Sequence, residues 1–554
     1  QHATGPNYLF YICNYMSKIR EQLLAGFEKE YKKLNENQKK AVDQTEGPVM
    51  VIAGPGTGKT QILAIRIGKI LLATDTLPQN ILCLTYTEAG AIAMRERLVK
   101  FIGTDAYKVN ISTFHSFCNQ IIQENLSVFQ KNELNPIDEL ERVQLLKTLI
   151  DDLPAGHLLK RLKGDVYYDS FALERLFSDM KRENWSISFL HEKIDECLKS
   201  LPEREEFIYK RKSGPNKAGD LKMNKINEET ERMEKLKAAV SLFENYQSLM
   251  NKNGFYDFDD MINWVIKAFD NQPELLADYQ EKYQYILVDE YQDTSGSQNY
   301  LVFQLINYWD QPNVFVVGDD DQSIFRFQGA NVKNMEDFHK KYEKDIQTIV
   351  LTNNYRSTQP ILDISSSLIE LNTERLINKR PGLKKDLIAS HPEINKLKNL
   401  PEIFEYDSER HELIGITKKV VSLIEKGTEP SEIAVIFKEN KYLVELLNLF
   451  RLKDIPAYCK RSVNLFDIPF CNSLIDIIRY LAEEHDTPFG GDEILFRMLH
   501  FNFFNIEPIE IATITSELKY VSGKKESLRE AISLLAANKE TKNTVSENLI
   551  NACI

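Results

Sequence analysis

The residues with the clearest chemical meaning in this sequence are Val49–Thr60, which read VMVIAGPGTGKT. The apolar run Val49–Ile52 predicts a short buried strand, and it leads directly into a glycine-rich turn. Lys59 and Thr60 follow the turn, and the next residues, Gln61–Leu72, are apolar and fit a helix. A strand, a glycine turn and a helix in this order are the context that a phosphate-binding loop requires.

Such a loop binds phosphate because glycines let the backbone approach an anion, and the helix that begins there points its positive end at the same place. Lys59 is placed to reach the β- and γ-phosphates of ATP, and the Thr60 hydroxyl is placed to hold Mg²⁺. The sequence therefore predicts ATP and Mg²⁺ as cofactors. The residues expected to bind them are Ala53, Gly54, Pro55, Gly56, Thr57, Gly58, Lys59 and Thr60. Ala53 stands where the pattern usually begins with glycine, and the alternative interpretation is a glycine-rich surface turn.

An acidic pair follows a second apolar strand, Tyr285–Val288. Beside a phosphate-binding loop, Asp289 would hold Mg²⁺ and Glu290 would polarise the attacking water. Two adjacent carboxylates at a strand end mean little alone because turns are often acidic. Together with the loop at Val49–Thr60 they indicate nucleotide hydrolysis.

Other predicted strands also end in polar or aromatic side chains. Ile81–Leu84 leads to Thr85 and Tyr86, and Val109–Phe117 is predicted to be a third strand with His115 near its end. The alternation of strands and helices predicts a parallel α/β sheet, in which ligands collect at the carboxyl ends of the strands.

Two later segments extend the candidate site. The strand Val314–Val317 is followed by acidic residues, by Gln322, and then by Phe325 and Phe327. Two aromatic side chains around an arginine favour a platform for stacked bases, although core packing is the alternative. Near the end of the segment Ile349–Ser357, Tyr355 is a candidate to stack on adenine and Arg356 to reach the γ-phosphate. Gln38, ahead of the phosphate-binding loop, is a candidate for the adenine edge, or simply a solvated side chain.

The remaining chain divides by character. Asn119 to about Met250 is charged and helical in pattern, and its basic stretch Tyr209–Lys222 is either a solvated loop or a loop that contacts phosphates. Ile403–Phe437 predicts two strands that flank a helix at His411–Lys426, as in a second α/β domain. From Glu483 onward the pattern is helical and polar.

Composition sets broad limits on function. The formal net charge of −13 argues mildly against a nucleic-acid partner, although phosphates respond to a local groove and not to the total charge. The sequence contains no run of eighteen apolar residues that would predict a membrane span. The first residues lack a signal-peptide pattern, and Met16 looks like a more natural start than Gln1. The seven scattered cysteines contain no C-x-x-C pair, which favours a reducing cytoplasm over a zinc or disulfide scaffold.

Taken together, these stretches resemble the motifs of the UvrD/Rep-type superfamily 1 DNA helicases. In the family's order they are the Q motif (Leu34–Gln38), motif I (Ala53–Thr60), motif Ia (Thr85–Arg97), motif Ib (Thr113–Phe117), a DFDD segment (Asp257–Asp260), motif II (Val288–Ser295), motif III (Val317–Ala330) and motif IV (Asn354–Ser357). The resemblance implies an ATP-dependent 3′→5′ DNA helicase that moves along single-stranded DNA and unwinds duplex junctions, in repair, replication or recombination.

The resemblance also implies an α/β fold with a RecA-like P-loop core and a role for each matching residue. The expected domains are an N-terminal extension (1–33), a RecA-like domain 1A (34–118 and 251–330), a helical insertion 1B (119–250), the first half of a RecA-like domain 2A (331–482) and the start of a helical insertion 2B (483–554). Gln38 and Tyr355 would hold adenine, and the catalytic residues would be Lys59, Glu290, Gln322 and Arg356. Thr60 and Asp289 would hold Mg²⁺. The expected contacts with single-stranded DNA are Thr85, Tyr86, Thr113, His115, Phe325 and Phe327.

The sequence departs from the family pattern in several places. Gln61 replaces the basic residue that is common after the P-loop, and Phe327-Gln328 stands where the family often has Trp-Arg. No motif V or motif VI is found, so a second arginine finger is missing, and we expect the chain to be the N-terminal part of a longer protein. We therefore expect residues 1–554 alone to hydrolyse ATP slowly and not to unwind duplex.

Other functions remain open at this point. One is an ATP-gated module that binds single-stranded nucleic acid without unwinding, another is an RNA-directed ATPase, and a third is the helicase part of a helicase–nuclease. The sequence gives no pathway, oligomeric state or protein partner.

Overall fold

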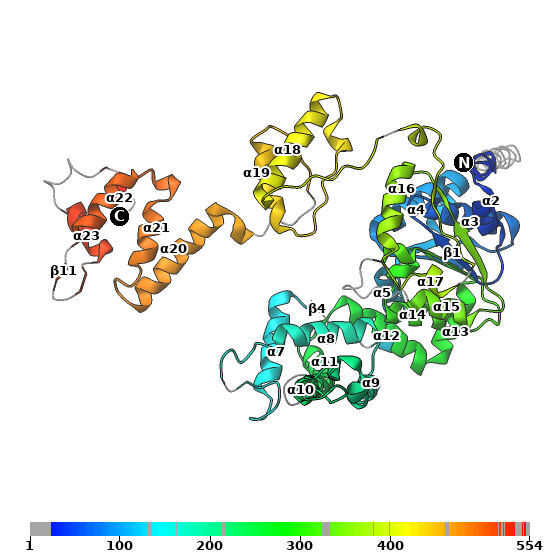
Figure 1. Cartoon of the computed structure of the whole chain (residues 1–554), viewed down its shortest axis with the longest axis horizontal. Helices are drawn as coiled ribbons and strands as arrows, with labels where there is room; N and C mark the ends of the chain where they lie inside the picture. Colours follow the sequence, from blue (N-terminus) through cyan, green and yellow to red (C-terminus); the bar gives the residue numbers. More distant parts are fainter. Residues whose placement is uncertain are drawn as a thin grey trace, which may run out of the picture. The chain divides into compact units, whose positions relative to one another are not determined.

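The computed structural model describes residues 24–129, 135–161, 163–212, 216–323, 333–380, 382–397, 399–459 and 465–518, with shorter stretches up to 549. The chain forms two compact units, of which the first ends at Glu402 and the second begins at Ile403 (Figure 1). No helix in these ranges is long and apolar enough to cross a membrane.

The first unit is built on a parallel sheet of six strands in the order β3-β2-β6-β7-β1-β8. The strands are β1 (Val49–Ala53), β2 (Ile81–Thr85), β3 (Asn110–Thr113), β6 (Tyr285–Val288), β7 (Val314–Gly318) and β8 (Gln347–Leu351). Every residue of the four central strands is buried, which explains why they read as continuous apolar runs. The predicted α/β fold is confirmed.

Helices cover both faces of the sheet, and β1 shows how the two faces are divided. Met50 and Ile52 pack with residues of α5 (Phe114–Glu124), α12 (Phe258–Asn271), α13 (Pro273–Lys282), α14 (Gly296–Ile306) and α15 (Lys333–Lys341). Val49, Val51 and Ala53 pack on the opposite face with α2 (Glu36–Asp43), α3 (Lys59–Ala73) and α4 (Glu88–Ile102). Successive side chains of a strand point to opposite faces, so one strand contributes to both cores.

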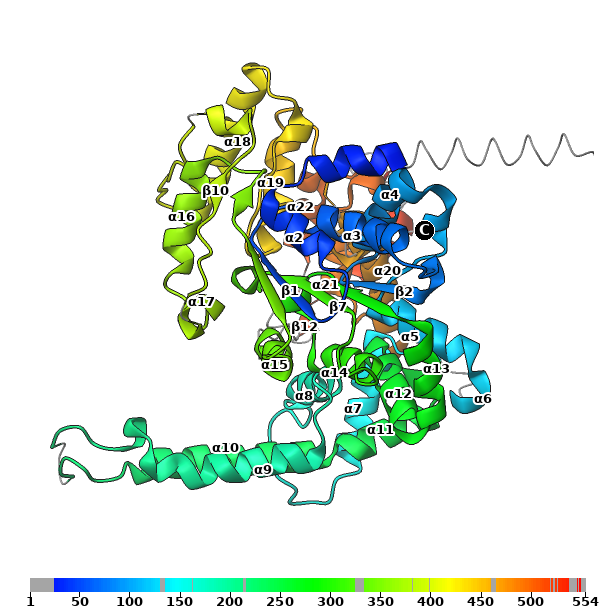
Figure 2. The same ribbon diagram turned by 90° about the vertical axis from the view of Figure 1, so that its right-hand side faces the viewer.

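The region expected to be a helical insertion is mostly helical. It contains α6 (Leu126–Phe129), α7 (Glu139–Asp151), α8 (Ser170–Arg182), α9 (Ile187–Ser200), α10 (Met223–Ser241) and α11 (Phe243–Lys252), with a core of its own. The short strands β4 (Asn135–Pro136) and β5 (Phe255–Tyr256) pair where the insertion leaves and rejoins the core. Figure 2 shows α9 and α10 side by side as a projecting arm, and the basic stretch Tyr209–Lys222 lies in the connection between them.

Two boundaries differ from the sequence prediction. The third strand is shorter than Val109–Phe117, because the Thr113 hydroxyl accepts the Ser116 N–H and begins α5 at Phe114. The first compact unit also extends past residue 330, because β8 pairs with β1 in the first sheet. It includes β9 (Asn353–Asn354), α16 (Gln359–Ile369), α17 (Leu376–Lys379) and β10 (Ile388–Ala389).

The second unit is mainly helical where it is described. Its elements are α18 (Glu409–Glu425), α19 (Lys441–Arg451), α20 (Pro469–Asp486), α21 (Asp492–Leu499), α22 (Pro508–Glu517), α23 (Leu528–Ala537) and the hairpin β11 (Tyr520–Val521) and β12 (Lys524–Lys525). The helix predicted at His411–Lys426 is α18, but the strands predicted on either side of it within Ile403–Phe437 are not formed, since neither has a hydrogen-bonded strand partner.

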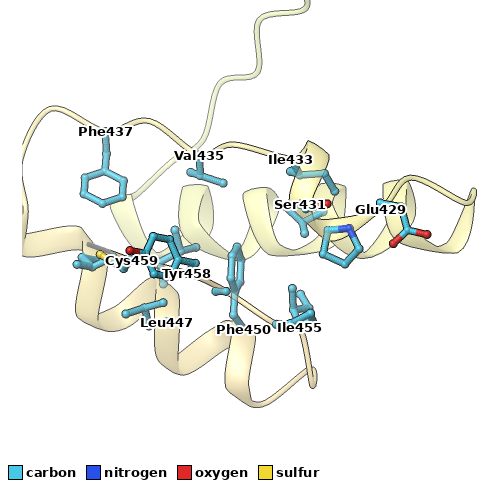
Figure 3. Close-up of a pocket in the computed structure, with 16 residues that line it drawn as sticks. Glu429, Ser431, Ile433, Val435, Phe437, Leu447, Phe450, Ile455, Tyr458 and Cys459 are labelled. Carbon is cyan, nitrogen blue, oxygen red and sulfur yellow. The ribbon is translucent and has the colours of Figure 1, made fainter. Parts of the chain in front are cut away.

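Side chains from α18, from α19 and from the two extended segments around Val435 and Tyr458 line a cavity of about 810 Å³ (Figure 3). Its lining is mainly apolar, with Phe437, Leu446 and Phe450 among the residues. It holds none of the side chains predicted to bind nucleotide or DNA.

A buried ion cluster joins the helical insertion to the sheet domain. Lys181, in the last turn of α8, places Nζ 2.6 Å from Asp257 Oδ2 and 2.9 Å from Asp260 Oδ2, and its side chain is only 2% exposed. Asp257 and Asp260 also form the capping box that begins α12. Burial lowers the pKa of Lys181, but the two carboxylates outweigh burial and raise it overall. The ammonium therefore stays charged inside the fold.

We predict that Lys181→Met lowers the free energy of unfolding by about 3–5 kcal/mol, because it leaves two buried carboxylates without their cation. Lys193→Met is the matched control, since Lys193 forms an exposed helical pair with Glu196. Urea denaturation of both variants, followed by circular dichroism, checks the prediction. Equal midpoints for the two variants would contradict it.

Candidate nucleotide site and adjoining nucleic-acid cavity

The predicted phosphate-binding loop has the required conformation. It joins the end of β1 at Ala53 to the start of α3 at Lys59, and Gly56 and Gly58 have φ angles of +66° and +87°. Left-handed backbone of this kind favours glycine. The Thr57 hydroxyl donates to the Gly54 carbonyl at 2.7 Å and closes the loop on itself. The first turn of α3 therefore presents its backbone N–H groups at the place where phosphate is expected.

Lys59 of motif I and Glu290 of motif II, 231 residues apart in the sequence, meet in the structure. The Lys59 ammonium donates to Glu290 Oε2 at 2.5 Å, and the Lys59 side chain is 10% exposed. Glu290 has a φ of +47°, a backbone conformation that is strained for a side chain of this kind. The pair links the two predicted catalytic groups directly, and a γ-phosphate would compete with Glu290 for the lysine.

Burial determines the charge of the other carboxylates at this strand end. Burial, with the nearby charge of Glu290, raises the pKa of Asp289 to about 7, against the opposing effect of Lys59. The same two causes raise the pKa of Asp293 to about 6, and Asp293 Oδ1 has no hydrogen-bond partner within the described residues. A buried carboxylate of this kind gains most from a bound cation. With the Thr60 hydroxyl on the same cavity, these oxygens suit Mg²⁺.

These groups surround one cavity of about 520 Å³ at the carboxyl end of the sheet. Its lining comprises Thr60, Thr85, Tyr86, Thr87, Gly90, Asp289, Glu290, Gln292, Asp293, Asp321 and Gln322. The structure thus brings together four residues whose sequence positions predict nucleotide chemistry: Thr60, Asp289, Glu290 and Gln322.

Gln292 connects the two acidic strand ends, and no role for it is predicted from the sequence. Its Nε2 donates to Glu290 Oε2 at 3.0 Å and to Asp293 Oδ2 at 3.1 Å, while its Oε1 accepts the Asp319 N–H at 2.9 Å. Gln322 in turn donates to Asp319 Oδ2. A continuous hydrogen-bonded chain therefore runs from Glu290 to Gln322.

The segment that contains Tyr355 and Arg356 lies against the phosphate-binding loop. Asn354 Nδ2 donates to the Pro55 carbonyl at 2.5 Å, and Tyr355 N donates to the Gly56 carbonyl at 2.9 Å. A Cβ on Gly56 would lie 2.6 Å from Arg356 Cβ, so a larger residue at position 56 would displace the arginine. Arg356 is exposed at this edge.

Gln38 is buried and supports the same loop. Its Nε2 donates to the Thr57 carbonyl at 2.8 Å, and its Oε1 accepts the Asn35 N–H at 3.0 Å. The neighbouring Asn35 side chain donates to the Tyr355 hydroxyl at 3.0 Å. Gln38 and Tyr355 are thus near each other, and their contact with adenine stays a prediction.

A second cavity, of about 510 Å³, lies where the helical insertion meets the sheet domain. It is lined by Thr85, Tyr86, Thr113, Phe114, His115, Arg142, Ser178, Arg182, Asp257, Phe258, Asp259, Asp293, Ser295 and Gln298. Four of the predicted DNA contacts, Thr85, Tyr86, Thr113 and His115, are therefore together. Asp259 lies 3.9 Å from His115 Nε2 and 3.7 Å from Arg182. Phe325 and Phe327, the other two, lie outside the described residues.

The sheet topology and the loop–acid pair define a P-loop nucleotide-binding protein with a RecA-like core. The chain belongs to the UvrD/REP helicase family. The family model of the UvrD/REP helicase N-terminal domain matches residues 34–343, and the model of the UvrD-like helicase C-terminal domain matches residues 349–522.

The chain is similar to two relatives described as ATP-dependent DNA helicase PcrA. It is 30% identical to the protein from Staphylococcus epidermidis over 462 residues, and 29% identical to the one from Staphylococcus aureus strain Mu50 over 460 residues. Each match covers 82% of this chain and 54% of the relative. The chain therefore spans about half the length of these relatives.

We predict that Lys59→Ala abolishes ATP hydrolysis and leaves the fold intact, because the Lys59 ammonium pairs with Glu290 and not with the core. Lys69→Ala, on the same helix, is the control, since Lys69 pairs with the exposed Asp43, lies over the Tyr31 ring and lines neither cavity. Phosphate release and thermal melting check both variants. Hydrolysis by Lys59→Ala at the parent rate would show that the phosphate site is misassigned.

We predict that Glu290→Gln keeps Mg-ATP binding and lowers the turnover number by about 10²–10⁴-fold, as expected when a residue that activates water is removed. The substitution removes the negative charge that pairs with Lys59, so ATP affinity is expected to stay equal or to increase. Equilibrium binding of ATP and single-turnover hydrolysis separate the two effects. An equal loss of binding and of rate would assign Glu290 a structural role.

Proposed function

We propose that this chain is the ATP-hydrolysing and DNA-binding part of an ATP-dependent 3′→5′ DNA helicase. The observation that carries the proposal is that the two cavities share three lining residues, Thr85, Tyr86 and Asp293. A change in the nucleotide cavity therefore acts directly on side chains that line the nucleic-acid cavity. Such sharing is what a motor needs, because it must couple ATP turnover to movement along a strand.

The proposed chemistry follows from the charged groups at the nucleotide cavity. Lys59 and the N-terminus of α3 would hold the phosphates, while Glu290, released from Lys59, would orient the attacking water. Thr60 and Asp289 would hold Mg²⁺, which neutralises phosphate charge during phosphoryl transfer. Arg356, next to the phosphate-binding loop, would stabilise the charge that develops on the transferred group.

The nucleic-acid cavity offers both stacking and cationic groups. Tyr86, His115 and Phe258 supply rings, and Arg142 and Arg182 supply positive charge. Base stacking together with backbone charge pairing is the usual basis for binding single strands without sequence preference. The projecting arm adds the basic stretch Tyr209–Lys222, which we propose contacts phosphates near a duplex junction.

Several finer features belong to the same proposal. We propose a role in DNA repair, replication or recombination, and we propose a cytoplasmic location, which agrees with free thiols at Cys83 and Cys118 in the structure. Movement in the 3′→5′ direction rests on the family resemblance.

Two measurements test the proposed function. ATP hydrolysis by this chain should rise in the presence of single-stranded DNA and less so with RNA of the same sequence. Residues 1–554 alone are not expected to unwind duplex, so unwinding is measured on a chain extended to the length of the PcrA relatives, which should unwind duplexes with a 3′ tail in preference to those with a 5′ tail. Stimulation without unwinding would favour an ATP-gated binding module. No stimulation by DNA would contradict the proposal.

We predict that Tyr86→Ala weakens binding of single-stranded DNA by about 1–3 kcal/mol, the usual effect of removing one stacking ring. DNA stimulation of ATP hydrolysis should fall as well, since Tyr86 lines both cavities. Tyr107→Ala is the control, because Tyr107 is 66% exposed and lines neither cavity. Fluorescence anisotropy with a labelled oligonucleotide gives the affinities. Equal affinity for the Tyr86→Ala variant and the parent would remove this residue from the DNA path.

A further inference from the structure

Three consecutive carboxylates at the end of β7 surround one buried lysine. Lys385 Nζ lies 2.7 Å from Asp320 Oδ1 and 2.8 Å from Asp321 Oδ2, and it also pairs with Asp319. The side chains of Lys385, Asp319 and Asp320 are 3%, 0% and 1% exposed. The three carboxylates are close enough to hold a metal ion, but the ammonium already occupies the place between them. The cluster is therefore a set of ion pairs that links two segments of the chain, and not a metal site.

A second cation fixes the outer side of the same cluster. Arg375 donates from Nε and from an Nη to the two oxygens of Asp321, at 2.7 and 2.8 Å. The Leu376 N–H donates to Asp320 Oδ2 at 2.8 Å. A bidentate arginine pair and a backbone bond leave little freedom in the position of the acidic residues. Arg375 and Lys385 both belong to the segment that follows α16, far from β7 in the sequence.

The same segment also touches the phosphate-binding loop and the residues before Arg356. A Cβ on Gly54 would lie 2.7 Å from Leu387 Cδ2, so Leu387 packs directly on the loop. The Ser390 N–H donates to the Asn354 carbonyl at 2.7 Å, and β10 pairs with β9 beside it. Residues of this segment thus contact three of the sequence motifs expected around the nucleotide, namely motifs I, III and IV.

Asp319 connects this cluster to the nucleotide cavity. One of its oxygens, Oδ1, pairs with Lys385, and the other, Oδ2, accepts the amide of Gln322. Gln322 lines the nucleotide cavity, whereas neither Lys385 nor Asp319 does. Burial raises the pKa of Asp319, and Lys385 and Gln322 oppose that effect. The orientation of Gln322 therefore depends on a carboxylate whose charge is balanced by Lys385.

We propose that Lys385 is a positioning residue for ATP hydrolysis, which acts through Asp319 to hold Gln322 toward the γ-phosphate of ATP. The inference rests on the proposed function, since it assigns Lys385 to the same nucleotide site. Without the ammonium, three neighbouring carboxylates would repel each other and would be expected to move apart or take up protons. Gln322 would then lose the fixed position of its acceptor, Asp319. The phosphate-binding loop would keep its own hydrogen bonds, and Lys59 would keep its pairing with Glu290.

The test compares Lys385→Met with Lys384→Met in the full chain. Lys384 is the adjacent residue and is exposed, so its variant controls for a lysine lost from the same segment. The double variant Lys385→Met/Asp320→Asn removes a carboxylate together with the cation, and it serves if the single variant does not fold. Gln322→Ala provides the reference for a lost γ-phosphate contact.

The first readout is the ratio of the affinities for ATPγS and ADP, measured by calorimetry. Lys385→Met should lower this ratio at least tenfold, as is expected of Gln322→Ala, with ADP affinity within twofold of the parent. Combining the two substitutions should add little, because both act on one contact. An unchanged ratio, or an equal loss of both affinities, would overturn the proposal, since a merely structural role gives one of those results.

The second readout needs no nucleotide and separates this inference from the proposed function. Amide hydrogen exchange in the peptide that covers Gly318–Ser323 should speed up at least tenfold in Lys385→Met and not in Lys384→Met. Unchanged exchange would overturn the role of Lys385 even if the parent is an active DNA-dependent ATPase. If exchange is faster in Lys385→Met but the parent does not hydrolyse ATP with DNA, the role of Lys385 stands and the proposed function is contradicted.

Discussion

The balance of buried negative charge at the ends of two neighbouring strands, β6 and β7, is the constraint on which the rest of the site depends. The carboxylates are Asp289, Glu290 and Asp293 after β6 and Asp319, Asp320 and Asp321 after β7. Burial raises the pKa of Asp289, Asp293 and Asp319, so these carboxylates need a nearby cation or hydrogen-bond donor to stay charged. Lys59 forms an ion pair with Glu290, and Lys385 and Arg375 form ion pairs with the carboxylates after β7. The segments that bring these cations must therefore fold against the sheet.

This charge balance separates two kinds of cation in the site. Lys59 is held by one partly exposed carboxylate, so an incoming phosphate can displace that partner. Lys385 is held by the buried carboxylates of Asp319 and Asp320 and by the half-buried Asp321, so displacing one partner leaves the other two in place. The first lysine is thus suited to bind ligand, whereas the second is suited to keep the surrounding loops in place. Hydrogen bonds of Gln292 and Gln322 connect the two strand ends.

Much of the fold and part of the site could be predicted from the sequence, and the difference has a physical origin. The central strands are buried on both faces, so their apolar runs stand out, and the residues after them are fixed by chain connectivity. Lys385 lies in none of the recognised motifs, and Gln292 lies in motif II without an expected role, since both act through contacts with Asp319, which is distant from them in the sequence. The strand Val109–Phe117 was predicted too long because the cap formed by Thr113 ends it, and β8 was not expected in the first sheet because its pairing with β1 is non-local.

The central claim is that one set of side chains couples the nucleotide cavity to the nucleic-acid cavity. The most direct test is thermodynamic linkage, in which the affinity for a single-stranded oligonucleotide is measured with and without saturating ATPγS, and the affinity for ATPγS with and without the oligonucleotide. Coupled sites must change each other's affinity by the same factor, typically about 5–150-fold. We expect a factor in that range for the parent chain. A factor of one in both directions would mean that the cavities are independent, and it would contradict the account.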